Sequence, residues 1–432
     1  MRIAPARRIR GKVSLPGDKS ISHRAAIIAA LASGISHITN FSTGADCAAT
    51  IAGLRSLGVS IVEKNKNLVI AGAGRQGLRP SPAPLACSNS GSTMRMLAGV
   101  LAAQDFKSIL VGDASLSRRP MTRIIDPLAA MGAIVTSKDG TSPLTIIGSP
   151  LLKGIAYELP VASAQVKSSI LLAALNAKGR TEITESLPGT RDHTERMLEW
   201  FGVPVSKRFD GGTKTIGLDG PVVLLAKDIC VPGDISSAAY LLAAAGSIAG
   251  SALTVADICL NPTRTSFLEV FKTIGLESQV TNVREVSNEP IGSIEVTGKR
   301  KSNESPIRLS GAASAQTIDE LPLLAVLGSQ TLGGIEIRDA EELRLKESDR
   351  ISATANNLRA MGVPVKEFDD GMRISSAKLR GARIKSYGDH RITMAFTVAA
   401  LLAESESEID DTDCVAVSFP EFFETLEAIV EH

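Results

Sequence analysis

The sequence predicts an α/β protein of two domains, and two observations favour this class. The chain has 432 residues, which is more than a single hydrophobic core usually contains. A helix end followed by a strand also recurs along it, with glycines that suit a left-handed helix C-cap: Gly58, Gly132, Gly202, Gly275 and Gly362. Residues 420–426 form a sixth copy. We therefore expect six units of about 70 residues, each with two helices and several strands, arranged as two domains of three units.

A second kind of helix, small and apolar, recurs in the same register after a polar motif. We expect these helices to begin near Arg24, Met94, Ser168, Ser236, Leu321 and Thr393. In the first motif, residues 15–24, Ser20 or Ser22 can cap the helix, and Lys19 and Arg24 add positive charge. Because helix N-termini attract anions, six such starts indicate an anion-binding site. At any single start, a capped helix with solvated charges is the alternative.

Arginines stand beside the expected starts of the other helix type. Arg119, Arg191 and Arg350 each lie close to a residue that could cap a helix. A cation at a helix N-terminus opposes the helix dipole unless an anion lies between them. We therefore expect these three arginines to contact a ligand.

Composition and charge exclude several classes of protein. Lys and Arg number 47 against 46 Asp and Glu, so no overall field favours nucleic acid or a membrane surface. Aromatic residues are only 3%, which argues against stacking on single-stranded nucleic acid. The five cysteines have no metal-ligand or disulfide spacing, and neither a secretory signal nor a membrane span is evident. We expect a cytoplasmic protein with reduced thiols and no metal or cofactor.

Eight motifs, taken in order, resemble the 5-enolpyruvylshikimate-3-phosphate synthases (3-phosphoshikimate 1-carboxyvinyltransferases), the enolpyruvyl transferases of aromatic amino-acid biosynthesis. They cover nearly the whole chain: residues 15–24, 89–95, 112–120, 163–165, 233–237, 319–322, 341–350 and 388–394. The forms of residues 112–116 and 190–193 look more like the divergent bacterial branch of this family than the enteric branch.

The resemblance implies a two-domain inverse α/β barrel with three βαβαββ units in each domain. Residues 1–18 and 233–432 would form a discontinuous domain with Asp319, Glu347, Arg350 and His390. Residues 19–232 would form an inserted domain with most contacts to shikimate 3-phosphate, and the active site would lie in the cleft between the domains. The family also suggests a monomer.

The reaction that the resemblance implies is attack by the 5-hydroxyl of shikimate 3-phosphate on C2 of phosphoenolpyruvate, followed by loss of phosphate. Asp319 resembles the base near the hydroxyl, and Glu347 resembles the group that exchanges a proton with the methylene carbon. Lys19 would contact both substrates and assist proton transfer. His390 would form a hydrogen bond nearby, and a purely structural histidine is the alternative.

The same resemblance implies two sets of binding residues. Those for shikimate 3-phosphate are Lys19, Ser20, Arg24, Ser163, Ala164, Gln165, Arg191, Asp319 and Lys346. Those for phosphoenolpyruvate are Lys19, Gly91, Arg119, Gln165, Arg350 and Arg391. Planar guanidinium groups suit paired phosphate and carboxylate oxygens. Gly91 would let the backbone approach a ligand, and a glycine that only its turn requires is the alternative.

Two positions depart from the enteric pattern, and both concern substrate contacts. Ala164 stands where the enteric branch has a serine, so it could contribute only through its backbone. Val417 stands in place of an enteric lysine that contacts phosphoenolpyruvate, so one cation contact is lost. The divergent branch is expected to share this replacement. Family members that tolerate the herbicide glyphosate have alanine at the position of Gly91. This chain has glycine there, so we expect glyphosate to inhibit the protein.

Two other functions remain as alternatives. UDP-N-acetylglucosamine enolpyruvyl transferase would have Lys-Asn rather than Lys19-Ser20, and a reactive cysteine where this chain has none between Cys87 and Cys230. A non-catalytic anion-binding homologue would have no use for the carboxylates of Asp319 and Glu347, which repel anions. An ion pair between Glu347 and Arg350, three residues apart, is the structural explanation of that glutamate.

Overall fold

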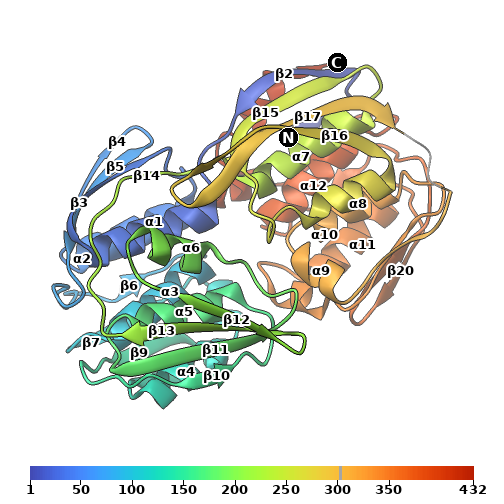
Figure 1. Cartoon of the computed structure of the whole chain (residues 1–432). Helices are drawn as coiled ribbons and strands as arrows, with labels where there is room; N and C mark the ends of the chain where they lie inside the picture. The colour runs from blue at the N-terminus through green and yellow to red at the C-terminus, as the bar shows by residue number, and fades with distance from the viewer. Residues whose placement is uncertain (301–303) are drawn as a thin grey trace. The chain divides into compact units, whose positions relative to one another are not determined.

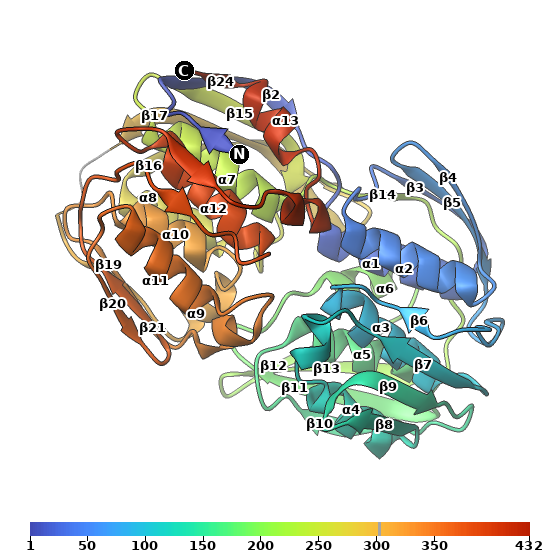
Figure 2. The same ribbon diagram turned by 180° about the vertical axis from the view of Figure 1, so that it is seen from behind.

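The structure is a computed structural model that describes residues 1–300 and 304–432, and it divides into two compact units. Unit 1 comprises Met1–Pro16, Pro232–Glu285 and Pro290–His432, and unit 2 comprises Gly17–Val231 and Val286–Glu289. Figures 1 and 2 show each unit as helices surrounded by small sheets. The sequence led us to expect chain crossings after residues 18 and 232, and it gave no sign of the segment Val286–Glu289.

Unit 2 contains three βαβαββ repeats, each with one four-stranded sheet. The first repeat has α1 (Lys19–Leu31), β3 (Ser33–Thr39), α2 (Ala45–Ser56), β4 (Ser60–Lys64), β5 (Asn67–Ala73) and β14 (Ile229–Cys230). The second has β6 (Leu85–Ala86), α3 (Gly91–Ala102), β7 (Lys107–Val111), η1 (Leu116–Arg118), α4 (Thr122–Met131), β8 (Ile134–Lys138) and β9 (Thr141–Ile147). The third has β10 (Ala156–Glu158), α5 (Ala164–Ala174), β11 (Gly179–Ser186), α6 (His193–Trp200), β12 (Ser206–Asp210) and β13 (Thr213–Gly220).

The three sheets of unit 2 share one topology. Their strand orders are β14-β3-β5-β4, β6-β7-β9-β8 and β10-β11-β13-β12. In each sheet the first two strands are parallel and the other neighbours are antiparallel. A helix connects the parallel pairs β6–β7 and β10–β11, as a parallel connection requires, whereas β14 returns to β3 from the far end of the unit. Short turns join the consecutive antiparallel strands β4–β5, β8–β9 and β12–β13.

Unit 1 repeats the plan with more variation in its sheets. Its first repeat has β2 (Arg8–Ser14), α7 (Ile235–Ser247), β15 (Ala252–Cys259), α8 (Ser266–Ile274), β16 (Leu276–Val286) and β17 (Glu289–Arg300). The second has β18 (Ile307–Leu309), α9 (Ala312–Gln316), α10 (Leu321–Gly328), β19 (Ile335–Ile337), η2 (Glu341–Leu345), α11 (Arg350–Ala360), β20 (Val365–Phe368) and β21 (Gly371–Ile374). The third has β22 (Arg383–Ile384), α12 (His390–Leu401), β23 (Ser407–Ile409), η3 (Asp413–Val417), α13 (Phe422–Glu427), β24 (Val430–Glu431) and β1 (Arg2–Ile3). The strand orders are β16-β17-β15-β2-β24, β18-β19-β21-β20 and β1-β23-β22. The predicted six units in two groups of three are confirmed.

The small apolar helices form the core of each unit. Every residue of α10 and α12 is buried, as are the last eleven residues of α1. Helices that are apolar on all sides must be enclosed, and the sheets provide this enclosure while their outer faces meet solvent. All five residues of β12, for example, are exposed. Within the described residues, no helix has both the length and the apolar character needed to cross a membrane.

The predicted helix ends are confirmed, as are the predicted starts near Leu321 and Ser236, whereas the other four starts were placed late. Gly58, Gly132, Gly202, Gly275 and Gly362 all have φ between 84° and 110°, the left-handed region that favours glycine at a helix end. The core helices begin up to five residues before the predicted positions: α1 begins at Lys19 rather than near Arg24, and α5 at Ala164 rather than near Ser168. In α1, α5, α7 and α12 the capping residue is Asp or Ser at the beginning of the motif, so most of the motif forms the first helical turn instead of preceding it.

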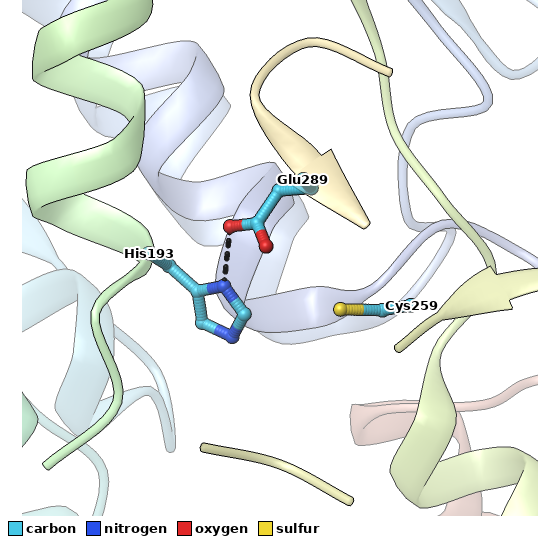
Figure 3. Close-up of side chains that lie close together, drawn as sticks. All are labelled: His193, Cys259 and Glu289. Carbon is cyan, nitrogen blue, oxygen red and sulfur yellow. Dashed lines mark hydrogen bonds and ion pairs between the residues drawn. The ribbon is translucent and has the colours of Figure 1, made fainter. Parts of the chain in front are cut away.

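The turn between β16 and β17 belongs to unit 2 although its strands belong to unit 1. His193 Nδ1 lies 2.6 Å from Glu289 Oε1, and both side chains are buried (Figure 3). Asn288 Nδ2 donates to the carbonyl of Arg196 at 2.7 Å, and the amide of Cys230 donates to Ser287 Oγ at 3.0 Å. These bonds fix the turn to α6 and to the end of β14, which explains the segment that the sequence did not indicate.

Candidate active site

The start of α1 places a lysine beside a carboxylate in unit 2. Asp18, not Ser20 or Ser22, caps this helix: its Oδ1 accepts from the amide of Ile21 at 3.0 Å. Ser22 instead accepts from the amide of Ser42 at 3.0 Å. Lys19 Nζ lies 3.0 Å from Asp46 Oδ2, and the lysine side chain is 17% exposed. Lys19 is therefore held in place but accessible.

Arg24 is buried and held by three neutral acceptors. Its Nη1 donates to the carbonyl of Ser20 at 2.7 Å, its Nε to Thr194 Oγ1 at 2.6 Å, and its Nη2 to Ser168 Oγ at 2.8 Å. Ser168 and Thr194 also lie 2.6 Å apart, so α1, α5 and α6 meet at this guanidinium. These three bonds orient Arg24 through neutral groups.

Gly91 is the first residue of α3 and lies against two arginines. Ser90 caps the helix by accepting from the amide of Thr93 at 3.1 Å. A Cβ on Gly91 would lie 2.7 Å from Arg95 Nη1 and 3.5 Å from Arg119 Nη1. Because a helical backbone suits any residue, the turn does not require glycine here, and the space beside the two guanidinium groups is what a side chain would fill.

The two arginines beside Gly91 are fixed by further polar groups of unit 2. Arg119 is buried and donates from Nη2 to Asn89 Oδ1 at 2.5 Å and to Ser115 Oγ at 3.3 Å. Arg95 Nη1 donates to Gln165 Oε1 at 2.7 Å, and Gln165 Nε2 donates to Ser92 Oγ at 2.8 Å. Gly91, Arg119 and Gln165, which the sequence analysis assigned to one substrate, thus share one region of the unit.

The other predicted residues of unit 2 lie at the starts of α5 and α6. Ser163 caps α5 by accepting from the amide of Val166 at 3.4 Å, and Ala164 is the first residue of that helix. Arg191 lies half-buried in the loop between β11 and α6. Ser163 and Ala164 thus lie at the start of α5, four residues earlier than predicted, and Arg191 lies just before α6, close to its N-cap Asp192.

A buried arginine organises the predicted residues of unit 1. Arg350, 2% exposed, begins α11 and donates from Nε to Asp389 Oδ2 at 2.8 Å and from Nη2 to Glu347 Oε2 at 2.6 Å. Its Nη1 lies 3.7 Å from Asp319 Oδ1. Burial alone would lower the pKa of Arg350, but Asp389 and Glu347 raise it above its ordinary value. The predicted pair of Glu347 with Arg350 exists, and the same guanidinium also reaches Asp319.

Arg391 lies in the first turn of α12, close to a second pair of carboxylates. Its Nη1 lies 3.5 Å from Glu320 Oε1, and its Nη2 lies 4.0 Å from Asp319 Oδ2. Glu320 also accepts from Ser236 Oγ at 2.5 Å. Burial lowers the pKa of Arg391, whereas nearby groups, Asp319 and Glu320 among them, raise it well above the ordinary value. Asp319 therefore lies between two arginines.

Lys346 and His390 complete the predicted set in unit 1. Burial lowers the pKa of Lys346, the Asp319 carboxylate raises it, and Arg350 lowers it, with a net shift below the ordinary value. His390 is the first residue of α12, is buried, and has its Nδ1 3.9 Å from Asp389 Oδ1. Val417 is half-buried at the end of η3.

Sequence reasoning missed the residues that orient the predicted ones. They are Asp46, Asn89, Arg95, Ser168, Thr194, Glu320 and Asp389. Asp389 could have been found, because it precedes a helix start as Asp18 and Asp234 do. Asn89, Arg95 and Glu320 lie within the sequence motifs, and Ser168 was expected only as a helix start, so none of them was given a role. Asp46 and Thr194 carry no local signal, because they lie far in sequence from the side chains that they contact.

The chain has two units of three βαβαββ repeats. Arginines and lysines lie at the helix starts, and one arginine pairs with two carboxylates. This combination defines a group-transfer enzyme for anionic substrates. The family model described as EPSP synthase (3-phosphoshikimate 1-carboxyvinyltransferase) matches residues 3–426. The chain belongs to this family. It is an enolpyruvyl transferase of shikimate-pathway aromatic biosynthesis that acts on small molecules.

Full-length relatives agree with this membership. The chain is 49% identical over 433 residues to a 3-phosphoshikimate 1-carboxyvinyltransferase of Koribacter versatilis, covering 100% of this chain and 99% of the relative. It is 44% identical to the enzyme of that name from Geobacter sp. strain M21, with 99% of each chain covered. The solved structure of an EPSP synthase from Acinetobacter baumannii superposes with a TM-score of 0.85 at 41% identity, covering 99% of this chain and 98% of that one.

These comparisons confirm the family that the sequence motifs indicated and the two-domain α/β fold. They do not favour the nucleotide-sugar enolpyruvyl transferase that was the nearest alternative. The resemblance rested on eight motifs spread along the chain, and the match over residues 3–426 extends it to nearly every residue between them.

Proposed function

We propose that the chain transfers the enolpyruvyl group of phosphoenolpyruvate to the 5-hydroxyl of shikimate 3-phosphate with the residues named above in distinct roles. The observation that carries the proposal is the contact of Arg350 with both Glu347, at 2.6 Å, and Asp319, at 3.7 Å. One buried guanidinium thereby fixes two carboxylates, and an addition followed by an elimination needs two groups that exchange protons.

Unit 2 supplies most of the cations for shikimate 3-phosphate. Arg24, Arg191 and Lys19 would bind its phosphate and carboxylate oxygens, with Lys346 of unit 1 as a further contact. Ser20, Ser163, Ala164 and Gln165 would complete the set at the first turns of α1 and α5. Backbone amides there add positive partial charge to the formal charges, which supports anion binding.

The phosphoenolpyruvate contacts would come from Arg119, Arg350 and Arg391, with Lys19, Gln165 and the backbone at Gly91. Arg119 lies beside Gly91, where a Cβ would fill the space next to its guanidinium. Val417 stands where a lysine contact would be, so the remaining arginines carry the phosphate and the carboxylate. Planar guanidinium groups are suited to this because they bind two oxygens at once.

In the addition step, Asp319 would accept the proton of the 5-hydroxyl as its oxygen forms a bond to C2 of phosphoenolpyruvate. Glu347, protonated, would donate a proton to the methylene carbon, which becomes a methyl group. In the elimination, Glu347 would take a proton back from that methyl group while the bond from C2 to the phosphate oxygen breaks. The leaving phosphate oxygen would take the proton that Asp319 accepted, so both carboxyl groups return to their starting states. Lys19 would neutralise the developing charge, and His390 would form a hydrogen bond near the reacting atoms.

Two wider expectations belong to the same proposal. We propose that the enzyme works as a monomer in the cytoplasm. The five cysteines are scattered and form no disulfide in the part of the chain that the structure describes, which supports a reducing compartment. Sedimentation at catalytic concentration should give the mass of one chain, and a dimer at that concentration would contradict the monomer.

The experiment for the proposal combines product formation with proton exchange. Purified protein with phosphoenolpyruvate and shikimate 3-phosphate should release phosphate, whereas replacing the shikimate ester by UDP-N-acetylglucosamine should not. In heavy water, the methylene group of phosphoenolpyruvate should gain deuterium during turnover, and Glu347→Gln should abolish this exchange. Undiminished exchange in that variant would reject the role of Glu347.

A further inference from the structure

The loop that carries Arg191 lies on a buried cluster of four charged side chains within unit 2. Lys167 comes from α5, Glu185 from β11, Glu195 from α6 and Lys214 from β13. The side chains of Lys167 and Glu195 are fully buried, and those of Glu185 and Lys214 are 2% and 9% exposed. Two positive and two negative groups balance one another, which is the condition under which charges tolerate burial.

The cluster is joined by short contacts from four elements. Lys167 Nζ lies 3.0 Å from Glu185 Oε1 and 2.7 Å from Glu195 Oε1, and Lys214 Nζ lies 3.7 and 3.9 Å from the same two atoms. Glu185 and Lys214 are direct partners across the antiparallel pair of β11 and β13. Burial lowers the pKa of Lys167, but the two glutamates raise it above its ordinary value, so the lysine is charged.

Every polar group of Thr190, the residue before Arg191, is bonded to this cluster. Its amide and its Oγ1 donate to Glu185 Oε2 at 3.0 and 2.7 Å, and its carbonyl accepts from Lys167 Nζ at 3.4 Å. Gly189, with φ of +84°, packs so closely that a Cβ there would lie 3.1 Å from Glu185 Oε1. The loop is therefore fixed on both sides of its backbone immediately before Arg191.

The same cluster lies next to the residues that hold Arg24. Lys167 precedes Ser168 on α5, and Glu195 follows Thr194 on α6, and these two hydroxyls accept from Arg24. Apolar side chains would pack this site at less cost, because burying two ion pairs requires removing four charges from water. An orienting role gives a reason to retain them.

We infer that Glu185 and Lys167 are positioning residues that hold the 189–191 turn so that Arg191 meets the phosphate of shikimate 3-phosphate. This inference rests on the proposed role of Arg191. Glu185 and Lys167 themselves act through Thr190 and do not contact the substrate. Their effect is consequently specific to one of the two substrates.

The test compares two variants, each of which neutralises one of the two glutamates that pair with Lys167 and Lys214. Glu185→Gln loses a carboxylate that holds Thr190, whereas Glu195→Gln loses its counterpart on α6. We expect Glu185→Gln to raise the KM for shikimate 3-phosphate about tenfold or more, the loss of one charge-assisted hydrogen bond, with the KM for phosphoenolpyruvate within about twofold. Glu195→Gln should leave both KM values within about twofold.

A second readout follows the loop directly and does not depend on the substrate. Hydrogen exchange of the peptide that spans residues 187–192 should be faster in Glu185→Gln than in the parent, because the Thr190 amide loses its charged acceptor. Thr190→Val removes only the hydroxyl bond to Glu185. It should raise the KM for shikimate 3-phosphate less than Glu185→Gln does. Equal exchange and equal KM values in the two glutamine variants would overturn the inference.

A parallel Arg191→Ala variant separates the two ideas. If it raises the KM for shikimate 3-phosphate while Glu185→Gln does not, the positioning inference is wrong and the role of Arg191 stands. If Arg191→Ala leaves that KM unchanged, the proposed role of Arg191 is wrong, and the inference falls with it. In the double variant the two effects should not add, because both act on one contact.

Discussion

The cations of the two units are oriented by different kinds of acceptor. In unit 2, Arg24 donates to two hydroxyls and a carbonyl, and Arg119 donates to an amide oxygen and a hydroxyl. In unit 1, Arg350 and Arg391 lie beside four carboxylates: those of Asp319, Glu320, Glu347 and Asp389. The contrast concerns the predicted substrate-binding arginines: Lys19 of unit 2 pairs with Asp46, and the buried Lys167 pairs with Glu185 and Glu195.

This difference separates binding from proton transfer. Hydrogen bonds to neutral acceptors orient a guanidinium, and these bonds do not themselves offset its charge. Carboxylates beside an arginine offset its charge, and they are also the groups that can take up or release a proton during turnover. Unit 2 is thus suited mainly to hold anions, and unit 1 to hold them and exchange protons with them.

The largest effect should come from removing a proton-transfer group of unit 1. Glu347→Gln keeps the shape and a hydrogen-bonding group beside Arg350, so we expect kcat to fall by about 10²- to 10⁴-fold with little change in the KM for shikimate 3-phosphate. Steady-state kinetics with both substrates checks this. The exposed Glu341→Gln on η2 is the matched control and should behave as the parent. Near-normal turnover of Glu347→Gln would remove the distinction between the units.

Loss of a carboxylate acceptor in unit 1 should reduce stability more than loss of a neutral acceptor in unit 2. Asp389→Asn leaves the buried Arg350 short of a carboxylate, so we expect a loss of about 3 kcal/mol in the free energy of unfolding. Thr194→Val removes a neutral acceptor of Arg24 and should cost about 1 kcal/mol. Denaturant unfolding measures both. If the two losses were equal, the acceptors would not differ in the way that the structure indicates.

A moderate effect should follow from adding a methyl group to unit 2. Gly91→Ala places a Cβ 2.7 Å from Arg95 Nη1, the far end of a flexible side chain, so the protein should fold and the guanidinium groups should move slightly. We expect the KM for phosphoenolpyruvate to rise roughly tenfold, equivalent to about 1.4 kcal/mol. Glyphosate should inhibit the parent and inhibit the variant less. A parent that keeps full activity at high glyphosate would reject this use of Gly91.

The smallest effect concerns pH. The pKa of Lys346 lies below the ordinary lysine value, so its ammonium loses its proton at a lower pH than an unperturbed lysine. The KM for shikimate 3-phosphate should therefore begin to rise at a lower alkaline pH in the parent than in Lys346→Arg, because arginine stays charged throughout that range. Identical pH profiles of kcat/KM in the two proteins would show that Lys346 does not bind that substrate in its charged form.

Much of the fold could be predicted because its signals are local. A glycine after a helix reports the left-handed C-cap that all five predicted positions adopt. The starts of the helices were placed less well, since serines and aspartates in one motif compete for the cap, and only the backbone geometry selected Asp18 over Ser20 and Ser22. The turn at Val286–Glu289 could not be predicted, because its bonds to α6 link residues about 90 positions apart in sequence.

By itself, the sequence determined the six repeated units, their grouping by threes and the cations at the helix starts, because helix periodicity, capping and charge are properties of short segments. Only the tertiary structure decided which acceptor each cation meets. Arg350 finds Asp389 from 39 residues away, and Arg24 finds Thr194 from 170 residues away. Hydrogen bonds depend on distances of about 3 Å, which packing fixes and residue order does not. The contrast between neutral acceptors in unit 2 and carboxylates in unit 1 is therefore a property of the folded chain.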